Sequence, residues 1–169
     1  MKLLIFGIPG SGKTTFANRL GKETGIEVFH IDRHFFESGG WSERPQEDFL
    51  RDVKKCLERT SWIIDGNGMR TLEMRFKEAD IAIYCCPPRW ICLVRVLYRW
   101  LITLGQVKPD GPEGATNSVS WRLVKYLWKF TERYDSPINT LRKRYPTVRF
   151  FCVKSSQEFD HLFQKLIQT

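Results

Sequence analysis

Apolar residues follow two alternating patterns along the chain. Five short runs are apolar at most positions, over residues 3–6, 26–31, 62–64, 81–85 and 148–153. Runs of this kind are typical of parallel strands that are buried on both faces of a sheet. Between them, apolar residues recur at helical spacing, over residues 13–23, 46–59, 72–78, 89–104 and 159–167. This alternation of strands and helices predicts an α/β protein with a five-stranded parallel sheet.

The length of 169 residues is that of one domain, and no repeat or long linker divides the chain. We therefore expect a single domain over residues 1–169. Residues 105–114 are rich in Gly, Pro and charged residues and poor in apolar ones. This composition predicts a mobile loop after the helix that begins at Arg89.

Composition narrows the function classes. The chain carries 27 Lys and Arg against 19 Asp and Glu, a net charge of +8, so its surface favours phosphates, nucleic acids or acidic membranes. No apolar stretch reaches the ~18 residues that a transmembrane helix needs, and the first apolar run is too short for a signal peptide. The five cysteines include no C-x-x-C pair, which argues against a disulfide framework or a zinc site. We expect a cytoplasmic protein without a membrane partner, with Cys85 and Cys86 as buried thiols of a strand.

A phosphate-binding motif follows the first predicted strand. Residues 7–14, Gly-Ile-Pro-Gly-Ser-Gly-Lys-Thr, match G-x-x-x-x-G-K-[ST] and precede a predicted helix. The glycines let the backbone curve around an anion, so that its N–H groups and the positive end of the helix face the phosphate oxygens. Lys13 is expected to reach the β and γ phosphates of a nucleotide, and the Thr14 hydroxyl to ligate Mg²⁺.

The expected nucleotide site combines this loop with one arginine after the fourth strand. It consists of Gly7, Ile8, Pro9, Gly10, Ser11, Gly12, Lys13, Thr14, Thr15 and Arg89. Asp65 lies at the carboxyl edge of the third predicted strand, where open α/β sheets bind ligands. We expect Asp65 to hold Mg²⁺ through water, although an ordinary turn aspartate would suit the same position.

Phosphoryl transfer needs a carboxylate near the acceptor. Asp32 ends the second predicted strand and could orient an acceptor hydroxyl or take up its proton. The alternative for Asp32 is a turn or helix-cap residue. His30, inside the same strand, is expected to be a packed side chain.

Phosphoryl transfer also needs positive charge on the transferring group. Arg95 and Arg99 are four residues apart and therefore share one face of a helix. Both are candidates to point into the cleft. The apolar residues expected to pack on this helix are Trp90, Val94, Leu97 and Leu101. If residues 103–120 form a lid, its closure would bring Arg133 onto the phosphoryl group and exclude water. The expected catalytic residues are Lys13, Asp32, Arg95, Arg99 and Arg133, with a solvated surface position as the alternative for Arg89, Arg95 and Arg99.

An insertion over residues 33–60 is the expected acceptor pocket. It contains Phe36, Trp41 and Arg44 before a helical pattern. Aromatic rings can stack on a base, and an arginine beside them can pair with the phosphate of the same nucleotide. The alternative is that these side chains cover the edge of the sheet.

Several of these segments together resemble one branch of known kinases. They are the phosphate loop, residues 30–32, 62–71 and 88–90, and the loop over 108–114. The W-[IV]-[IV]-D-G-N segment and the later Pro-Arg-Trp resemble the topology modulation protein (FlaR-like) branch of the adenylate-kinase-like P-loop kinases. The resemblance implies a P-loop NTPase of the nucleoside-monophosphate-kinase-like type, a three-layer sandwich with an acceptor-binding insertion and a lid. Adenylate kinases use an arginine of a similar Asp-Gly-x-Pro-Arg segment for the acceptor phosphate, and Arg70 is the nearest match, one residue late.

The leading hypothesis is a kinase that transfers the γ-phosphoryl group of ATP to a small acceptor, such as a nucleotide or nucleoside, with Mg²⁺. The resemblance favours ATP, and the chain has no N-K-x-D segment for guanine. Two alternatives stay open. One is a regulatory ATP-binding protein whose basic C-terminal third engages DNA, and the other is an ATPase with water as the acceptor.

Overall fold

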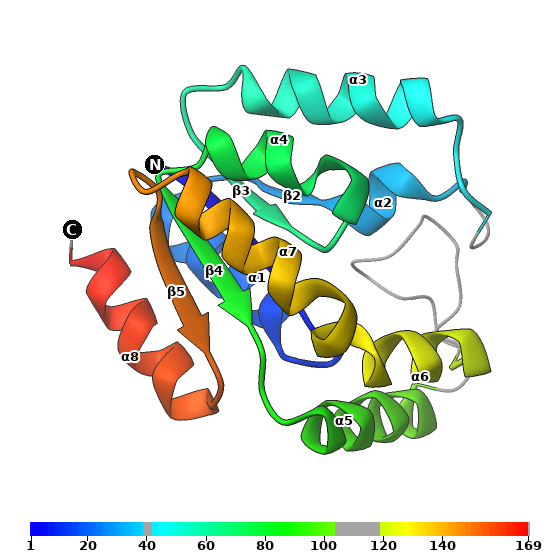
Figure 1. Cartoon of the computed structure of the whole chain (residues 1–169). Coiled ribbons are helices and arrows are strands. Elements are labelled where there is room, and N and C mark those ends of the chain that lie inside the picture. Colours follow the sequence, from blue (N-terminus) through cyan, green and yellow to red (C-terminus); the bar gives the residue numbers. More distant parts are fainter. Residues whose placement is uncertain (39–41, 104–118, 169) are drawn as a thin grey trace.

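A five-stranded parallel sheet forms the centre of the computed structural model, which describes residues 1–38, 42–103 and 119–168 (Figure 1). In the spatial order β2-β3-β1-β4-β5, the strands are β1 (Lys2–Gly7), β2 (Val28–His30), β3 (Trp62–Asp65), β4 (Ile81–Cys85) and β5 (Arg149–Val153). Each strand lies in or overlaps one of the apolar runs, so the predicted α/β class and parallel sheet are confirmed. β2 is shorter than its run because its pairing with β3 ends where His30 lies opposite Asp65.

Helices connect the strands and were predicted less completely. Those that match predicted segments are α1 (Lys13–Thr24), α3 (Gln46–Leu57), α4 (Leu72–Lys77), α5 (Arg89–Ile102) and α8 (Ser156–Ile167). The sequence analysis missed α2 (Ile31–Phe35), the 3₁₀ turn η1 (Met69–Thr71), α6 (Trp121–Trp128) and α7 (Phe130–Arg144). Of the helices within the described ranges, none combines the length and apolar character needed to cross a membrane.

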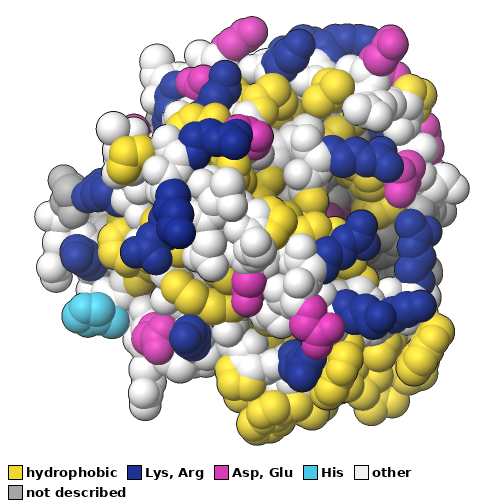
Figure 2. Space-filling view, viewed as in Figure 1, with side chains coloured by type: hydrophobic (Ala, Val, Ile, Leu, Met, Phe, Trp, Pro, Cys, Tyr) yellow, Lys and Arg dark blue, Asp and Glu magenta, His cyan; other side chains and the backbone are white. Residues whose placement is uncertain are grey.

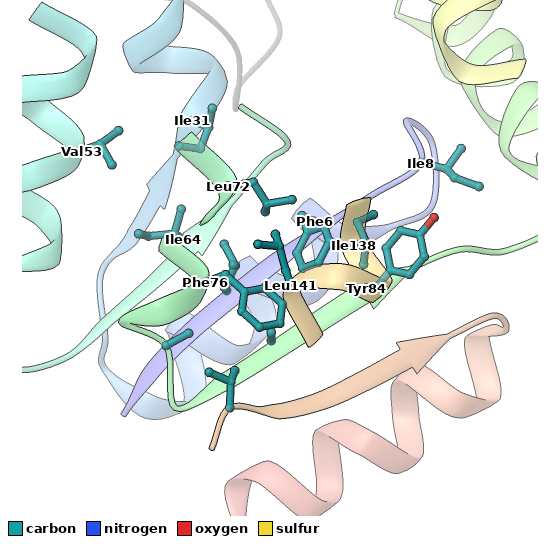
Figure 3. Packing of buried hydrophobic residues seen from close by; sticks show 14 of the residues in the cluster. Phe6, Ile8, Ile31, Val53, Ile64, Leu72, Phe76, Tyr84, Ile138 and Leu141 are labelled. Carbon is teal, nitrogen blue, oxygen red and sulfur yellow. The ribbon is translucent and has the colours of Figure 1, made fainter. Parts of the chain in front are cut away.

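The helices cover both faces of the sheet and make three layers. Successive residues of β1 point to opposite faces, so Leu3 and Ile5 pack with α1 and α8, while Leu4 and Phe6 belong to the core beneath α3, α4 and α7. Figure 3 shows the core that contains Phe6, whose ring stacks on that of Tyr84. The centroids of the two rings are 5.5 Å apart. Both faces of the strands are therefore covered, as their continuous apolar runs predicted.

Helix α5 packs on a different side from the one predicted. The exposed fractions of Trp90, Val94 and Leu101 are 62%, 58% and 58%, whereas Cys92 and Val96 are buried. The prediction that Trp90, Val94, Leu97 and Leu101 pack is therefore wrong, and Figure 2 shows apolar side chains gathered on the surface over α5. The reason is a close approach that only the folded chain creates, between α5 and the phosphate loop at Gly10.

Candidate active site

The phosphate loop joins the central strand to α1 in a conformation that requires glycine. Gly7 has φ 139°, and a Cβ at this position would lie 2.0 Å from the carbonyl oxygen of Cys85. The N–H of Ile8 donates to that same carbonyl at 2.9 Å, which closes the loop onto the end of β4. Gly10 has φ 79°, and a Cβ there would lie 2.5 Å from the Cys92 carbonyl oxygen on α5. The two glycines thus allow both the turn and the approach of α5.

Two cations reach this loop. The Nζ atom of Lys13, the first residue of α1, lies 3.5 Å from the carbonyl oxygen of Ile8, so the side chain folds back across the loop. Arg95 donates to the carbonyl of Ser11 at 3.4 Å and to the Ser156 hydroxyl at 3.2 Å. Within the described residues, the buried Ser11 hydroxyl has no hydrogen-bond partner. A buried polar atom without a partner beside two cations is consistent with a site for an anion.

Asp65 supplies a buried carboxylate at the carboxyl end of β3. It lies beside Ile5 of β1 and is only 4% exposed. His30 Nδ1 lies 3.1 Å from Asp65 Oδ2, so the histidine is packed, as predicted, and also holds the carboxylate. In the described part of the chain, Asp65 Oδ1 has no hydrogen-bond partner. Since Mg²⁺ prefers oxygen ligands and keeps several waters, Asp65 and the partly buried Thr14 fit a magnesium site.

A buried arginine shapes the turn that follows Asp65. Arg75 of α4 has no exposed surface and donates to the carbonyls of Gly66 at 3.0 Å and Gly68 at 2.9 Å, as well as to the Asn67 carbonyl. Burial lowers the pKa of Arg75 to about 9, so its guanidinium stays charged at neutral pH. The turn therefore forms around a fixed cation, which the sequence analysis did not identify.

Asn67, held by this turn, connects the phosphate loop to α6. Its Oδ1 accepts the Gly7 N–H at 2.9 Å, and its Nδ2 donates to the hydroxyl of Tyr126 at 3.2 Å. Sequence reasoning missed both side chains, although the position of Asn67 two residues after Asp65, at the ligand-binding edge, was an available signal. The Asn67 side chain therefore links the phosphate loop to α6 through two hydrogen bonds.

Asp32 does not lie at a strand end. β2 ends at His30, and Asp32 is in the first turn of α2, so its assignment to the end of the second strand was wrong. The physical reason is that strand pairing stops at His30, and the chain turns at once into a helix whose N-terminal turn favours a carboxylate. Burial raises the pKa of Tyr126, and Tyr134 and, more weakly, Asp32 raise it further, whereas the hydrogen bond from Asn67 and the charge of Arg133 on α7 lower it. The charges of Asp32 and Arg133 therefore both lie within electrostatic range of the Tyr126 hydroxyl.

Of the other arginines expected on α5, Arg89 has structural partners and Arg99 is exposed. Arg89 donates to Glu132 at 3.0 Å and lies over the Trp128 ring, where it joins α5 to α6 and α7. Arg99 is exposed one turn beyond Arg95, and Thr15, on α1, is exposed as well. Of these arginines, Arg95 is the one that contacts the phosphate loop.

The insertion is partly described. Arg44 donates to the His34 carbonyl at 2.8 Å and to Asp52 at 2.9 Å, which ties it to both α2 and α3. Phe36 is half-buried and bridges to Glu43, which lies 3.9 Å from the exposed Arg70. Trp41 and most of the expected lid, residues 104–118, lie outside the described residues.

Comparisons with known proteins agree with this architecture. Residues 3–79 match the model of the ATPase family associated with various cellular activities (AAA), which covers less than half of the chain. No curated protein matches the chain. Shikimate kinase from Acinetobacter baumannii in complex with shikimate is similar in structure, with a TM-score of 0.56, 17% identity, and 99% of this chain and 92% of that chain covered.

Deoxyadenosine kinase from M. mycoides with bound dATP is similar to the same degree. Its TM-score is 0.55 at 14% identity, with 98% of each chain covered. The chain therefore shares the α/β fold of these two kinases, with a five-stranded parallel sheet.

Proposed function

We propose that this protein is a kinase that transfers the γ-phosphoryl group of ATP to a small acceptor, such as a nucleotide or nucleoside. One observation carries the proposal: Asn67 hydrogen-bonds both the phosphate loop at Gly7 and the Tyr126 hydroxyl, which lies within electrostatic range of the charges of Asp32 and Arg133. A hydrolase needs only the nucleotide half of such a network. A second half with a carboxylate and an arginine suits an acceptor other than water.

The donor half would bind the triphosphate. The N–H groups of the loop, Lys13 and Arg95 would face its oxygens. Mg²⁺, held by Thr14 and through water by Asp65, would neutralise charge on the β and γ phosphates. His30 would keep the Asp65 carboxylate in place through the contact at 3.1 Å.

The acceptor half would position the attacking oxygen. Asp32 would accept the proton of an acceptor hydroxyl while that oxygen bonds to the γ-phosphorus. The bond between the γ-phosphorus and its bridging oxygen breaks, and ADP leaves. Arg133 would stabilise the charge on the transferring group, and Arg70 and Phe36 would contact the acceptor. The shikimate kinase of similar fold contains shikimate, which supports a small acceptor.

The proposal places the chain in the topology modulation protein branch of the adenylate-kinase-like kinases, on the W-[IV]-[IV]-D-G-N segment quoted above. The name of that branch suggests an action on DNA. The net charge of +8 is the observation that favours a DNA-binding, regulatory alternative. The experiment below separates the two.

The test measures ADP formation from Mg·ATP with nucleoside monophosphates, nucleosides and small hydroxylated metabolites as acceptors. We expect one acceptor class to stimulate turnover. Lys13→Ala should abolish it, because the variant loses the cation that crosses the loop. The kinase proposal fails if no acceptor stimulates turnover while the protein binds ATP and retains DNA at physiological salt.

The acceptor half has its own test. Asp32→Asn should leave ATP affinity within twofold and lower phosphoryl transfer by roughly 10²–10⁴-fold, the usual contribution of a general base. Asp48→Asn is the matched control, because Asp48 is on α3 and pairs with the exposed Arg51 at 2.6 Å. If Asp32→Asn weakens ATP binding as much as Lys13→Ala does, its assignment to the acceptor is wrong.

A further inference from the structure

Two cysteines meet where β4 ends beside the edge strand β5. Cys86 is the first residue after β4, and its N–H donates to the carbonyl of Val153 at 2.8 Å. Cys152 is in β5, in register with Tyr84. The two Sγ atoms are 2.6 Å apart, well inside the contact distance of two separate sulfur atoms. The prediction that Cys86 is a buried thiol within the strand was wrong, because β4 ends at Cys85 and Cys86 is half-buried beyond it.

Cys152 has the properties of a reactive, nucleophilic thiol. The contact with the Cys86 sulfur and the charge of Lys154 lower the pKa of Cys152, although burial opposes the shift. A lowered pKa increases the thiolate fraction, and the thiolate is the reactive form of cysteine. Cys152 is exposed on the edge strand β5, where a small oxidant can reach it.

The other cysteines differ in each of these respects. Cys56, Cys85 and Cys92 are buried. Burial raises the pKa of the Cys56 thiol to about 11 and also raises the pKa values of Cys85 and Cys92. None of the three has another sulfur atom within hydrogen-bond distance among the contacts that the described residues make.

We propose that Cys86 and Cys152 are a site of reversible oxidation, at which a hydroperoxide converts the two thiols into an intramolecular disulfide. The Cys152 thiolate attacks one oxygen of the peroxide, the O–O bond breaks, and Cys152 becomes a sulfenic acid while the peroxide leaves as water or an alcohol. The Cys86 sulfur then attacks the Cys152 sulfur, and water leaves as the S–S bond forms. Both sulfur atoms are oxidised and the peroxide is reduced. A thiol reductant reverses the step.

The proposed disulfide would lie close to elements that contact the phosphate loop. Cys86 continues through Pro87 and Pro88 into α5, whose Arg95 touches the loop at Ser11. The preceding residue, Cys85, accepts the N–H of Ile8. A covalent bond from Cys86 to β5 would hold the start of α5 against the sheet. The proposed disulfide itself does not depend on the proposed kinase activity.

The test is treatment of the purified, fully reduced chain with hydrogen peroxide, followed by alkylation of the remaining thiols and intact-mass analysis under denaturing conditions. We expect two of the five thiols to be lost with the removal of two hydrogen atoms. Peptide mapping should find Cys86 joined to Cys152, and dithiothreitol should restore all thiols. The unaltered chain suffices for this measurement, so it does not depend on the folding of any variant.

Cysteine variants show which of the two sulfur atoms is oxidised first. Cys152→Ser should prevent the rapid loss of thiols, whereas Cys86→Ser should leave a sulfenic acid on Cys152 that dimedone traps. Cys56→Ser is the matched control and should form the disulfide as the unaltered chain does, because Cys56 is buried on α3. The proposal is overturned if the five thiols are oxidised at similar rates, if Cys152 is oxidised without joining Cys86, or if the disulfides join separate chains.

Discussion

Replacement of the buried Arg75 by Met tests the idea that a single cation organises the turn after β3. Met has a similar length and no charge, so the variant keeps the packing volume and removes the donors. The guanidinium bonds the carbonyls of Gly66 and Gly68 at 3.0 and 2.9 Å and the hydroxyl of Thr71 at 3.1 Å, and it also donates to the Asn67 carbonyl. In the variant these oxygens lose the guanidinium as a donor, although the Gly68 carbonyl keeps its bonds from the N–H and the hydroxyl of Thr71.

The expected loss of stability follows from these contacts. A buried acceptor without a partner costs about 1–3 kcal/mol, and removal of one member of a buried charged network costs about 3–5 kcal/mol. The penalties share one site and do not add, and the variant no longer buries a charge. We therefore expect the free energy of unfolding to fall by about 3–5 kcal/mol, relative to the ~5–15 kcal/mol of a typical domain. At about 2–4 °C per kcal/mol for a chain of this size, Tm should fall by roughly 6–20 °C.

Thermal and urea unfolding, followed by circular dichroism, measure this effect. The matched control is Arg51→Met, since Arg51 is exposed on α3 and pairs only with Asp48 within the described part of the chain. An exposed pair of this kind contributes little. The reasoning is refuted if Arg75→Met lowers Tm no more than Arg51→Met does, because the carbonyls of residues 66–68 would then not depend on the guanidinium.

Two further predictions concern the phosphate loop and the insertion. Gly10→Ala should weaken ATP binding at least tenfold, measured by titration calorimetry, because the added Cβ meets α5; Gly25→Ala is the control, with φ 69° but open space at its Cβ. Although burial opposes it, hydrogen bonds from Arg44 and His34 lower the pKa of Asp52. A carboxyl whose pKa is lowered by folding stabilises the fold above its unfolded pKa and loses that contribution as the pH falls. Asp52→Asn should therefore flatten the decline of Tm below about pH 4, the ordinary range of Asp, and an unchanged pH profile would contradict this.

The fold was largely accessible from local patterns. The five strands were found because a parallel sheet covered on both faces leaves nearly continuous apolar runs. The phosphate loop was found because its geometry depends on backbone freedom at residues such as Gly7 and on a strand and a helix at its two ends. These signals are local, and each is complete within a few residues.

Two of the missed helices lack such local signals. Pro137 interrupts the pattern of α7, and α2 has only five residues. By contrast, α6 carries one, because Ser120 is an N-cap whose hydroxyl accepts the Leu123 N–H, but its apolar residues include the exposed Trp121 and Trp128. Tertiary contacts, such as the Tyr84 hydroxyl donating to Asp135 of α7 at 2.5 Å, stabilise these helices instead.

The sequence by itself determined the parallel sheet, the phosphate loop and the carboxylate of Asp65 at the edge of the sheet, because each follows from local residue pattern and chain direction. Only the tertiary structure decided that Arg95, rather than Arg99, reaches the loop, and that Asn67 joins Gly7 to Tyr126. A helix can place several residues toward a partner, and the choice depends on how its axis packs. Here the absence of a side chain at Gly10 lets the Cys92 side of α5 approach the loop, and that contact selects the arginine.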